Sequence, residues 1–129
     1  MKNLFKIIYL KKFQMNLNKF KKIEQLIEKK KIEQAEIELK NLGQDYSKDP
    51  YYLFLRGKIF YLKKLYYISI DTFLIALEFK DIDEIYDILS NIYQELGNYE
   101  LSKDLSNRNT RIKAVNELKD SMTGIYRIK

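Results

Sequence analysis

Apolar residues recur at steps of three and four along the middle of the chain, the spacing that places them on one face of an α-helix. The three clearest series are Leu53, Gly57, Phe60 and Tyr61; Ile70, Phe73, Leu74 and Leu77; and Tyr86, Leu89, Ile92 and Tyr93. They predict amphipathic helices over about residues 50–63, 66–79 and 82–96. Asp49 and Pro50 stand where an N-cap carboxylate and an N1 proline favour the start of the first helix.

The helical spacing continues on both sides of these segments. Upstream it predicts helices over about 17–30 and 32–42, the second ended by Gly43, and a basic amphipathic helix over 1–15. Downstream it predicts one helix from about Tyr99 to about residue 120 and a tail over residues 123–129. One proline and four glycines in 129 residues provide too few turns for an all-β protein, so we expect a chain of one domain's length that is all-α.

An internal repeat of 33 to 34 residues runs through these helices. The middle copy contains Gly57, Phe60, Lys64, Tyr66, Ser69, Phe73 and Ala76. At the same steps, the later copy has Ser90, Tyr93, Gly97, Tyr99, Ser102, Ser106 and Asn109, and the earlier copy has Ile23, Leu26, Lys30, Ile32, Ala35, Leu39 and Leu42. The period predicts helix-turn-helix units with breaks near Lys31, Lys64 and Gly97.

This pattern resembles the tetratricopeptide repeat (TPR) family, which has a small residue inside the first helix, an aromatic residue three positions on, and a glycine in the turn. The middle copy matches best, through Gly57, Phe60, Phe73 and Ala76, although Lys64 stands where the turn glycine is expected. The resemblance covers about residues 16–110 and implies repeats over about 16–49, 50–82 and 83–110. The predicted fold is therefore an all-α, TPR-like solenoid of about three repeats, flanked by a capping helix over 1–15 and a C-terminal extension over 111–129.

In this family, the first helices of successive repeats line a concave groove that takes a peptide or a partner helix. Carried over position by position, the resemblance assigns to the groove Tyr51, Phe54, Lys58, Tyr61 and Leu62 from the middle repeat and Glu84, Asp87, Asn91, Gln94 and Glu95 from the next. Such a groove suits a protein partner with apolar anchors followed by Lys or Arg. The alternative is that the aromatic residues belong to the core, covered by the N-terminal helices.

The N-terminal segment carries Lys2, Lys6, Lys11 and Lys12 among aromatic and aliphatic residues. Segments of this kind bind RNA, ribosomes or anionic membrane surfaces. The alternative is a cap that shields the apolar edge of the first repeat and extends its lysines to water. We favour the cap, because Leu4, Ile7, Ile8 and Leu10 are too apolar to remain in water.

The chain has no cysteine and no histidine. It therefore lacks the residues of disulfides and thiolate zinc sites, as well as the commonest metal ligand and general base. The acidic run over residues 81–84 lacks the further ligands and the glycine of a calcium loop, and acidic residues are expected at a helix N-terminus. We expect no enzyme activity, no cofactor and no metal, and interpret the chain as a protein–protein interaction adaptor or scaffold. The alternative function is a basic helical protein associated with RNA, ribosomes or an anionic membrane surface.

No stretch reaches the roughly 18 consecutive apolar residues of a membrane-spanning helix, and no small-residue cleavage site follows the first apolar run. We expect no integral membrane segment and a cytoplasmic location. The net charge of +6 is uneven, since residues 1–31 hold ten lysines and two glutamates whereas residues 81–104 hold one basic and seven acidic residues. Such an asymmetry would steer a charged partner or let two copies associate head to tail as a homo-oligomer. The alternative, which we favour for any one block, is a set of solvated helix faces.

Overall fold

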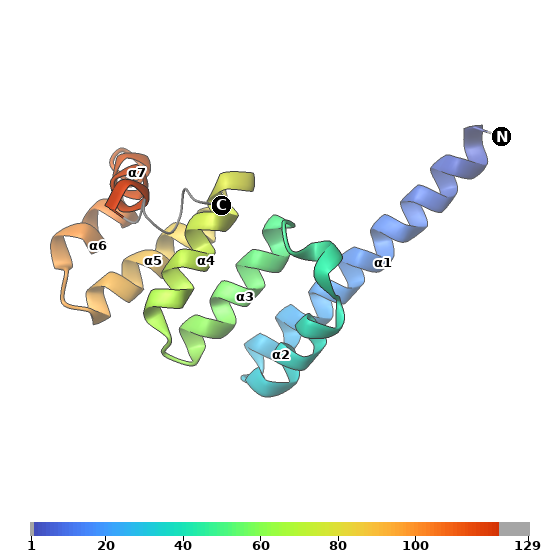
Figure 1. The fold of residues 1–129 in the computed structure, drawn as a ribbon, viewed down its shortest axis with the longest axis horizontal. Coiled ribbons are helices and arrows are strands. Elements are labelled where there is room, and N and C mark those ends of the chain that lie inside the picture. Colours follow the sequence, from blue (N-terminus) through green and yellow to red (C-terminus); the bar gives the residue numbers. More distant parts are fainter. Residues whose placement is uncertain (1, 122–129) are drawn as a thin grey trace. The chain divides into compact units, whose positions relative to one another are not determined.

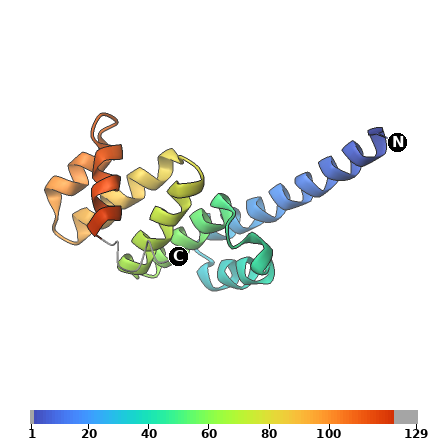
Figure 2. The same ribbon diagram turned by 45° about the horizontal axis from the view of Figure 1, so that its top comes forward.

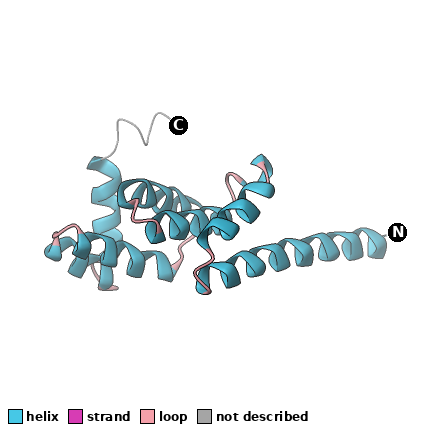
Figure 3. Ribbon diagram, turned by 90° about the horizontal axis from the view of Figure 1, so that it is seen from below, coloured by secondary structure: helices cyan, strands magenta, loops and turns pink. Residues whose placement is uncertain are grey.

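The computed structural model describes the backbone of residues 2–121 and, within it, all side chains but those of residues 2, 3, 5, 9–17 and 44. Seven α-helices and one short 3-10 helix follow in order: α1 (Lys2–Glu28), α2 (Ile32–Asn41), η1 (Gln44–Tyr46), α3 (Pro50–Leu62), α4 (Tyr66–Phe79), α5 (Asp83–Glu95), α6 (Tyr99–Ser106) and α7 (Arg111–Ser121) (Figure 1). Over this described part of the chain only helices and loops occur (Figure 3), which confirms the all-α prediction. The tail predicted over residues 123–129 lies outside the described residues.

The chain divides into two compact units between Tyr46 and Ser47. The first contains α1, α2 and η1, and the second contains α3 to α7. The repeat domain predicted over 16–110 spans this division. The division falls in a connection that starts at Gly43, with a left-handed φ of 83°, and ends at Asp49, whose carboxylate accepts hydrogen bonds from the backbone N–H groups of Tyr51 and Tyr52. The predicted N-cap and N1 proline of α3 are confirmed.

In the first unit, α1 is much longer than its partner α2. The two helices have 27 and 10 residues, which correspond to about 40 Å and about 15 Å, and α1 runs well past the end of α2 (Figure 2). The prediction of a separate helix over 1–15 is wrong, because residues 2–28 form one helix. No glycine or proline occurs before Gly43 to interrupt it. Among the described side chains of this unit, the buried ones come from the second half of α1 and from α2: Phe20, Ile23, Ile27, Ala35 and Leu39.

All three helix pairs are joined by the same turn. Lys30, Lys64 and Gly97 have left-handed φ angles of 61°, 61° and 84°. After each, the next backbone N–H donates to a carbonyl five residues back, from Lys31 to Leu26, from Leu65 to Phe60, and from Asn98 to Tyr93. This is the Schellman arrangement that ends many helices. The predicted breaks at 33- to 34-residue intervals are therefore confirmed, and the missing glycine at Lys64 is replaced by a lysine in the glycine conformation.

In the second unit, the helices of each pair contact at the predicted small residues. Ser69 Oγ of α4 donates to the carbonyl oxygen of Gly57 in α3, at 2.8 Å. One repeat later, Ser102 Oγ of α6 donates to the carbonyl oxygen of Ser90 in α5, at 2.7 Å, and Ser90 Oγ returns the bond to the Ser102 carbonyl. Both contacts join residues twelve apart, so the repeat register derived from the sequence holds in three dimensions.

The C-terminal helix of the prediction is two helices, with a break between Ser106 and Arg111. Polar side chains in the break form hydrogen bonds with the nearby backbone, and these bonds compete with the backbone hydrogen bonds that would continue the helix. Thr110 Oγ1 donates to the carbonyl of Asp104, and Asn107 Oδ1 accepts from the N–H of Asn109. Beyond it, α7 buries Ala114 and Val115. No described helix is long and apolar enough to cross a membrane.

Candidate interaction surface

α5 has a buried apolar face and an exposed polar one. Its buried side chains include Ile85, Ile88, Leu89 and Ile92. The exposed side chains that share its other face are Glu84, Asp87, Asn91 and Glu95, and we call these four residues the acidic face of α5. Successive members are three or four positions apart, which aligns them along the helix. Gln94 is also exposed. The structure thus places every predicted groove residue of this helix at the surface.

Lys58 connects α3 to the acidic face of α5. Its Nζ lies 2.8 Å from Glu84 Oε2 and 5.1 Å from the centroid of the Phe54 ring on its own helix. The Lys58 side chain is 20% exposed whereas that of Glu84 is 53% exposed. The structure therefore brings together one aromatic, one basic and one acidic residue of the predicted groove.

Phe54 belongs to the core and not to the groove surface, which corrects its assignment. Only 5% of the residue is exposed. Its ring packs against that of Phe73 in α4, with 6.3 Å between centroids, and the ammonium group of Lys58 lies over it. Phe54 is thus a core residue through its packing against α4, within the second unit.

The other predicted groove residues of α3 remain accessible but are spread along the helix. Tyr51, in the first turn, is 40% exposed, and Lys80 Nζ lies 4.7 Å from its ring centroid and donates to its hydroxyl oxygen at 2.8 Å. Tyr61, near the end, is half-buried, with its ring centroid 6.1 Å from that of Tyr66. Leu62 is 37% exposed. Because residues 51 and 61 are ten apart, about 15 Å separates the two tyrosines along the axis, so they do not form one aromatic cluster.

The acidic run before and at the start of α5 is held by α7, a contact that sequence reasoning missed. Arg111 Nη2 lies 2.8 Å from Asp83 Oδ1, and its guanidinium stacks 4.1 Å from the centroid of the Tyr86 ring. The Tyr86 hydroxyl donates to Asp81. The sequence signal that could have indicated this contact is the basic segment over residues 105–129, which directly follows the acidic segment over residues 81–104. Among the described residues, no group of three or more Asp, Glu, His or Cys side chains is arranged to hold a metal ion.

Electrostatic effects in this contact follow from its geometry. Burial, the hydrogen bond to Asp81 and the negative charge of that carboxylate raise the pKa of Tyr86 to about 12. The hydrogen bond to Asp83 raises the pKa of Arg111 above its ordinary value. Farther along α5, burial and the charge of Asp71 raise the pKa of Tyr93 to about 12. Both tyrosines are therefore neutral at physiological pH, and neither is poised as a nucleophile or base.

Three described apolar side chains in the N-terminal half of α1 lack the burial that the capping interpretation expected. Leu4, Ile7 and Ile8 are 61%, 48% and 56% exposed, so that interpretation is wrong for these three residues. Lys6, a candidate contact for nucleic acid or an anionic surface, is exposed as expected. The side chains of Lys2, Lys11 and Lys12 lie outside the described residues.

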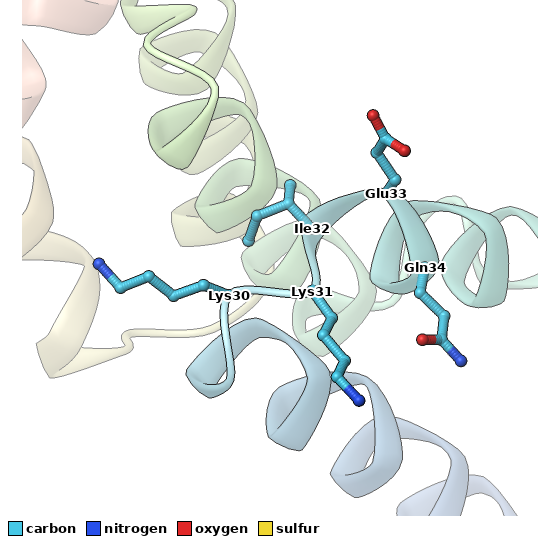
Figure 4. Close-up of a pocket in the computed structure, with 5 residues that line it drawn as sticks. All are labelled: Lys30, Lys31, Ile32, Glu33 and Gln34. Atoms are coloured by element: carbon cyan, nitrogen blue, oxygen red, sulfur yellow. The ribbon is translucent and has the colours of Figure 1, made fainter.

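At the turn between α1 and α2 lies a surface depression whose charged side chains do not point toward a common point. It is lined by Lys30, Lys31, Ile32, Glu33 and Gln34. The polar ends of the two lysines point in different directions, and Glu33 points away from both (Figure 4). We therefore assign no binding role to it.

Comparisons with protein-family models, with curated proteins and with solved structures found no match to this chain. The interpretation of its surfaces accordingly rests on its own residues and geometry.

Proposed function

We propose that the chain is a non-enzymatic adaptor built from degenerate TPR-like helix pairs, and that the second unit binds a protein segment along α3 and α5. The repeated turn at Lys30, Lys64 and Gly97 supports the repeat assignment. So does the close contact at Gly57, because a small residue inside the first helix is what allows its pair partner to approach.

The acidic face of α5 is the observation that carries the proposal. Four exposed polar residues, three of them acidic, follow one face of a helix whose opposite face is buried. A helix face that only contacts water can carry residues of either charge, so the absence of basic residues among these four favours a binding role. Beside it, Lys58 meets Glu84 at 2.8 Å, which joins this face to α3, and the accessible parts of Tyr61 and Leu62 lie on α3 itself.

The chemistry of this surface selects a partner with both apolar and basic residues. Lys or Arg side chains would pair with Asp87 and Glu95, and an apolar side chain would contact Tyr61 and Leu62. Complementary charge sets the register and the rate of association, while the apolar anchor supplies most of the affinity. The partner is therefore a peptide or helix with an apolar anchor near a basic pair. A cytoplasmic location is part of the proposal, because a chain without cysteine needs no oxidising compartment.

A peptide-display selection against the immobilised chain tests this function. Enriched peptides should combine apolar anchors with Lys or Arg. The variant Asp87→Lys/Glu95→Lys should bind them about tenfold or more weakly, because it places like charges opposite one another. The matched control Glu100→Lys/Glu117→Lys makes the same change in net charge at exposed positions of α6 and α7 and should bind as the parent does. Enrichment of peptides without basic residues, or equal binding by the two double variants, would refute the proposal.

A further inference from the structure

Two different faces of α1 carry large apolar side chains. Phe20, Ile23 and Ile27 are buried within the chain. Leu4, Ile7 and Ile8 are exposed, and because Ile7 and Ile8 are three and four positions after Leu4, the three share one face of the helix. At about 100° per residue, the centres of the two groups lie about 140° apart around the helix axis. The exposed group is therefore a separate apolar face, and not the outer end of the face that packs in the fold.

This exposed face belongs to the most basic part of the chain. Residues 1–23 contain seven lysines and no acidic residue. Of these lysines, Lys6, Lys19, Lys21 and Lys22 are exposed in the described structure, and Lys22 pairs with Glu38 at 3.5 Å. A helix that combines exposed aliphatic side chains with an excess of positive charge is matched by a surface that offers both negative charge and an apolar interior.

We propose that the N-terminal half of α1 binds the surface of an anionic phospholipid bilayer, with Leu4, Ile7 and Ile8 inserted at the level of the headgroups. The lysines need not share the apolar face. A helix is about 10–12 Å across and the Debye length at physiological salt is about 8 Å, so lysines that flank the apolar face are attracted to the bilayer, whereas charge on the far side of the helix is largely screened. The described helices include none that could span the membrane, so the proposed association is peripheral.

Exposed aliphatic side chains favour lipid over nucleic acid as the occupant. Phosphate groups of RNA are bound by cations and hydrogen-bond donors, which leaves Leu4, Ile7 and Ile8 in water. The headgroup region of a bilayer satisfies the lysines through lipid phosphates and also removes the three side chains from water. Only the second occupant uses both properties of this part of α1.

Vesicle co-sedimentation of the full chain tests the proposal. We expect binding to phosphatidylcholine vesicles that contain phosphatidylglycerol, much weaker binding to phosphatidylcholine alone, and a decrease with added salt. Ile7→Ser/Ile8→Ser should weaken binding to the anionic vesicles about tenfold or more. The matched control Ile37→Ser/Ile112→Ser changes two isoleucines that are 60% and 57% exposed in other helices and should bind as the parent does.

Folding and the alternative occupants are checked on the same proteins. Thermal unfolding should show the same melting temperature for the two double variants, and Leu4→Ser provides an independent change if Ile7→Ser/Ile8→Ser fails to fold. Absence of binding to anionic vesicles would overturn the proposal, as would equal binding by the two double variants. A chain that binds polyuridylic acid with or without Ile7 and Ile8 but ignores vesicles would be an RNA-binding protein. A chain that ignores vesicles but self-associates through these residues in sedimentation equilibrium would use the face for a second copy.

Discussion

A Cβ atom on residue 57 would lie 2.5 Å from Cε1 of the Phe73 ring. Phe73 is completely buried, so its ring cannot turn outward into solvent to avoid that contact. Glycine at position 57 is therefore required by the neighbouring helix and not by a turn. One repeat later, Ser90 stands at the position of Gly57 and Ser106 at the position of Phe73. The larger residue in place of the glycine is thus accompanied by a smaller one in place of the phenylalanine.

Gly57→Ala should destabilise the fold, although the same change in an ordinary helix is stabilising by about 0.5–1 kcal/mol. The added methyl group overpacks the contact with Phe73, and we expect a loss of about 1–3 kcal/mol in the free energy of unfolding. Urea denaturation of the two proteins measures it. The double variant Gly57→Ala/Phe73→Leu should lose less than the sum of the single changes, since the smaller side chain leaves room. Additive losses would show that the alanine acts elsewhere.

Lys64→Gly should stabilise the chain. Lys64 has a left-handed φ of 61°, a conformation that costs a residue with a side chain about 1–2 kcal/mol, while glycine adopts it freely at some loss of entropy on folding. We expect a net gain of about 0.5–1 kcal/mol, measured by thermal or chemical unfolding. Lys63→Gly is the control, because Lys63 has a φ of −83° and should lose stability when replaced. A loss in both variants would contradict the turn geometry.

Arg111→Met should loosen the docking of α7 far more than Arg108→Met. Arg111 lies 2.8 Å from Asp83 and stacks on Tyr86, whereas Arg108 is 80% exposed and 3.6 Å from the same carboxylate. Exposed ion pairs contribute little to stability. Hydrogen exchange should become faster over residues 111–121 in the first variant and stay unchanged in the second. Equal protection in both would mean that Ala114 and Val115 alone hold α7.

Stability should decrease as the pH rises above 10. The pKa values of Tyr86 and Tyr93 are raised to about 12 in the folded chain, against about 10 when unfolded. Their contribution is therefore fully present below about pH 10 and is lost as the pH rises through about 12, because the unfolded chain ionises first. Denaturation between pH 9 and 12 should show a smaller decrease for Tyr86→Phe/Tyr93→Phe than for the parent. Identical curves would show that lysine deprotonation alone explains the pH effect.

The repeat and its contacts could be predicted from the sequence because they depend on residues at fixed spacing. Gly57 and Ser69 are twelve residues apart, as are Ser90 and Ser102, and a helix pair with a fixed turn converts that spacing directly into a contact. The period also located the left-handed residue at Lys64, although lysine is not a residue that marks such a turn.

Other features depend on competition that a spacing rule does not include. The break after Ser106 follows from side chains that form hydrogen bonds with the nearby backbone. The spacing of apolar residues does not reveal this break, because that spacing continues on both sides of it. Phe54 has the spacing of a groove residue, but it is buried beside Phe73. Whether a side chain is buried there depends on the space between α3 and α4, which the spacing of residues does not specify. Arg111 and Asp83 form a hydrogen bond although they are 28 residues apart in sequence. At that separation, the basic and acidic blocks indicate that the two segments attract each other, but not which residues pair.

Isotope-edited NMR of the chain, titrated with a peptide from the display selection, tests the central claim most directly. We expect saturable amide shift changes concentrated in α3 and α5, at Lys58, Tyr61 and Leu62 and along the acidic face of α5. Changes confined to α1, or the absence of saturable changes in α5, would contradict it.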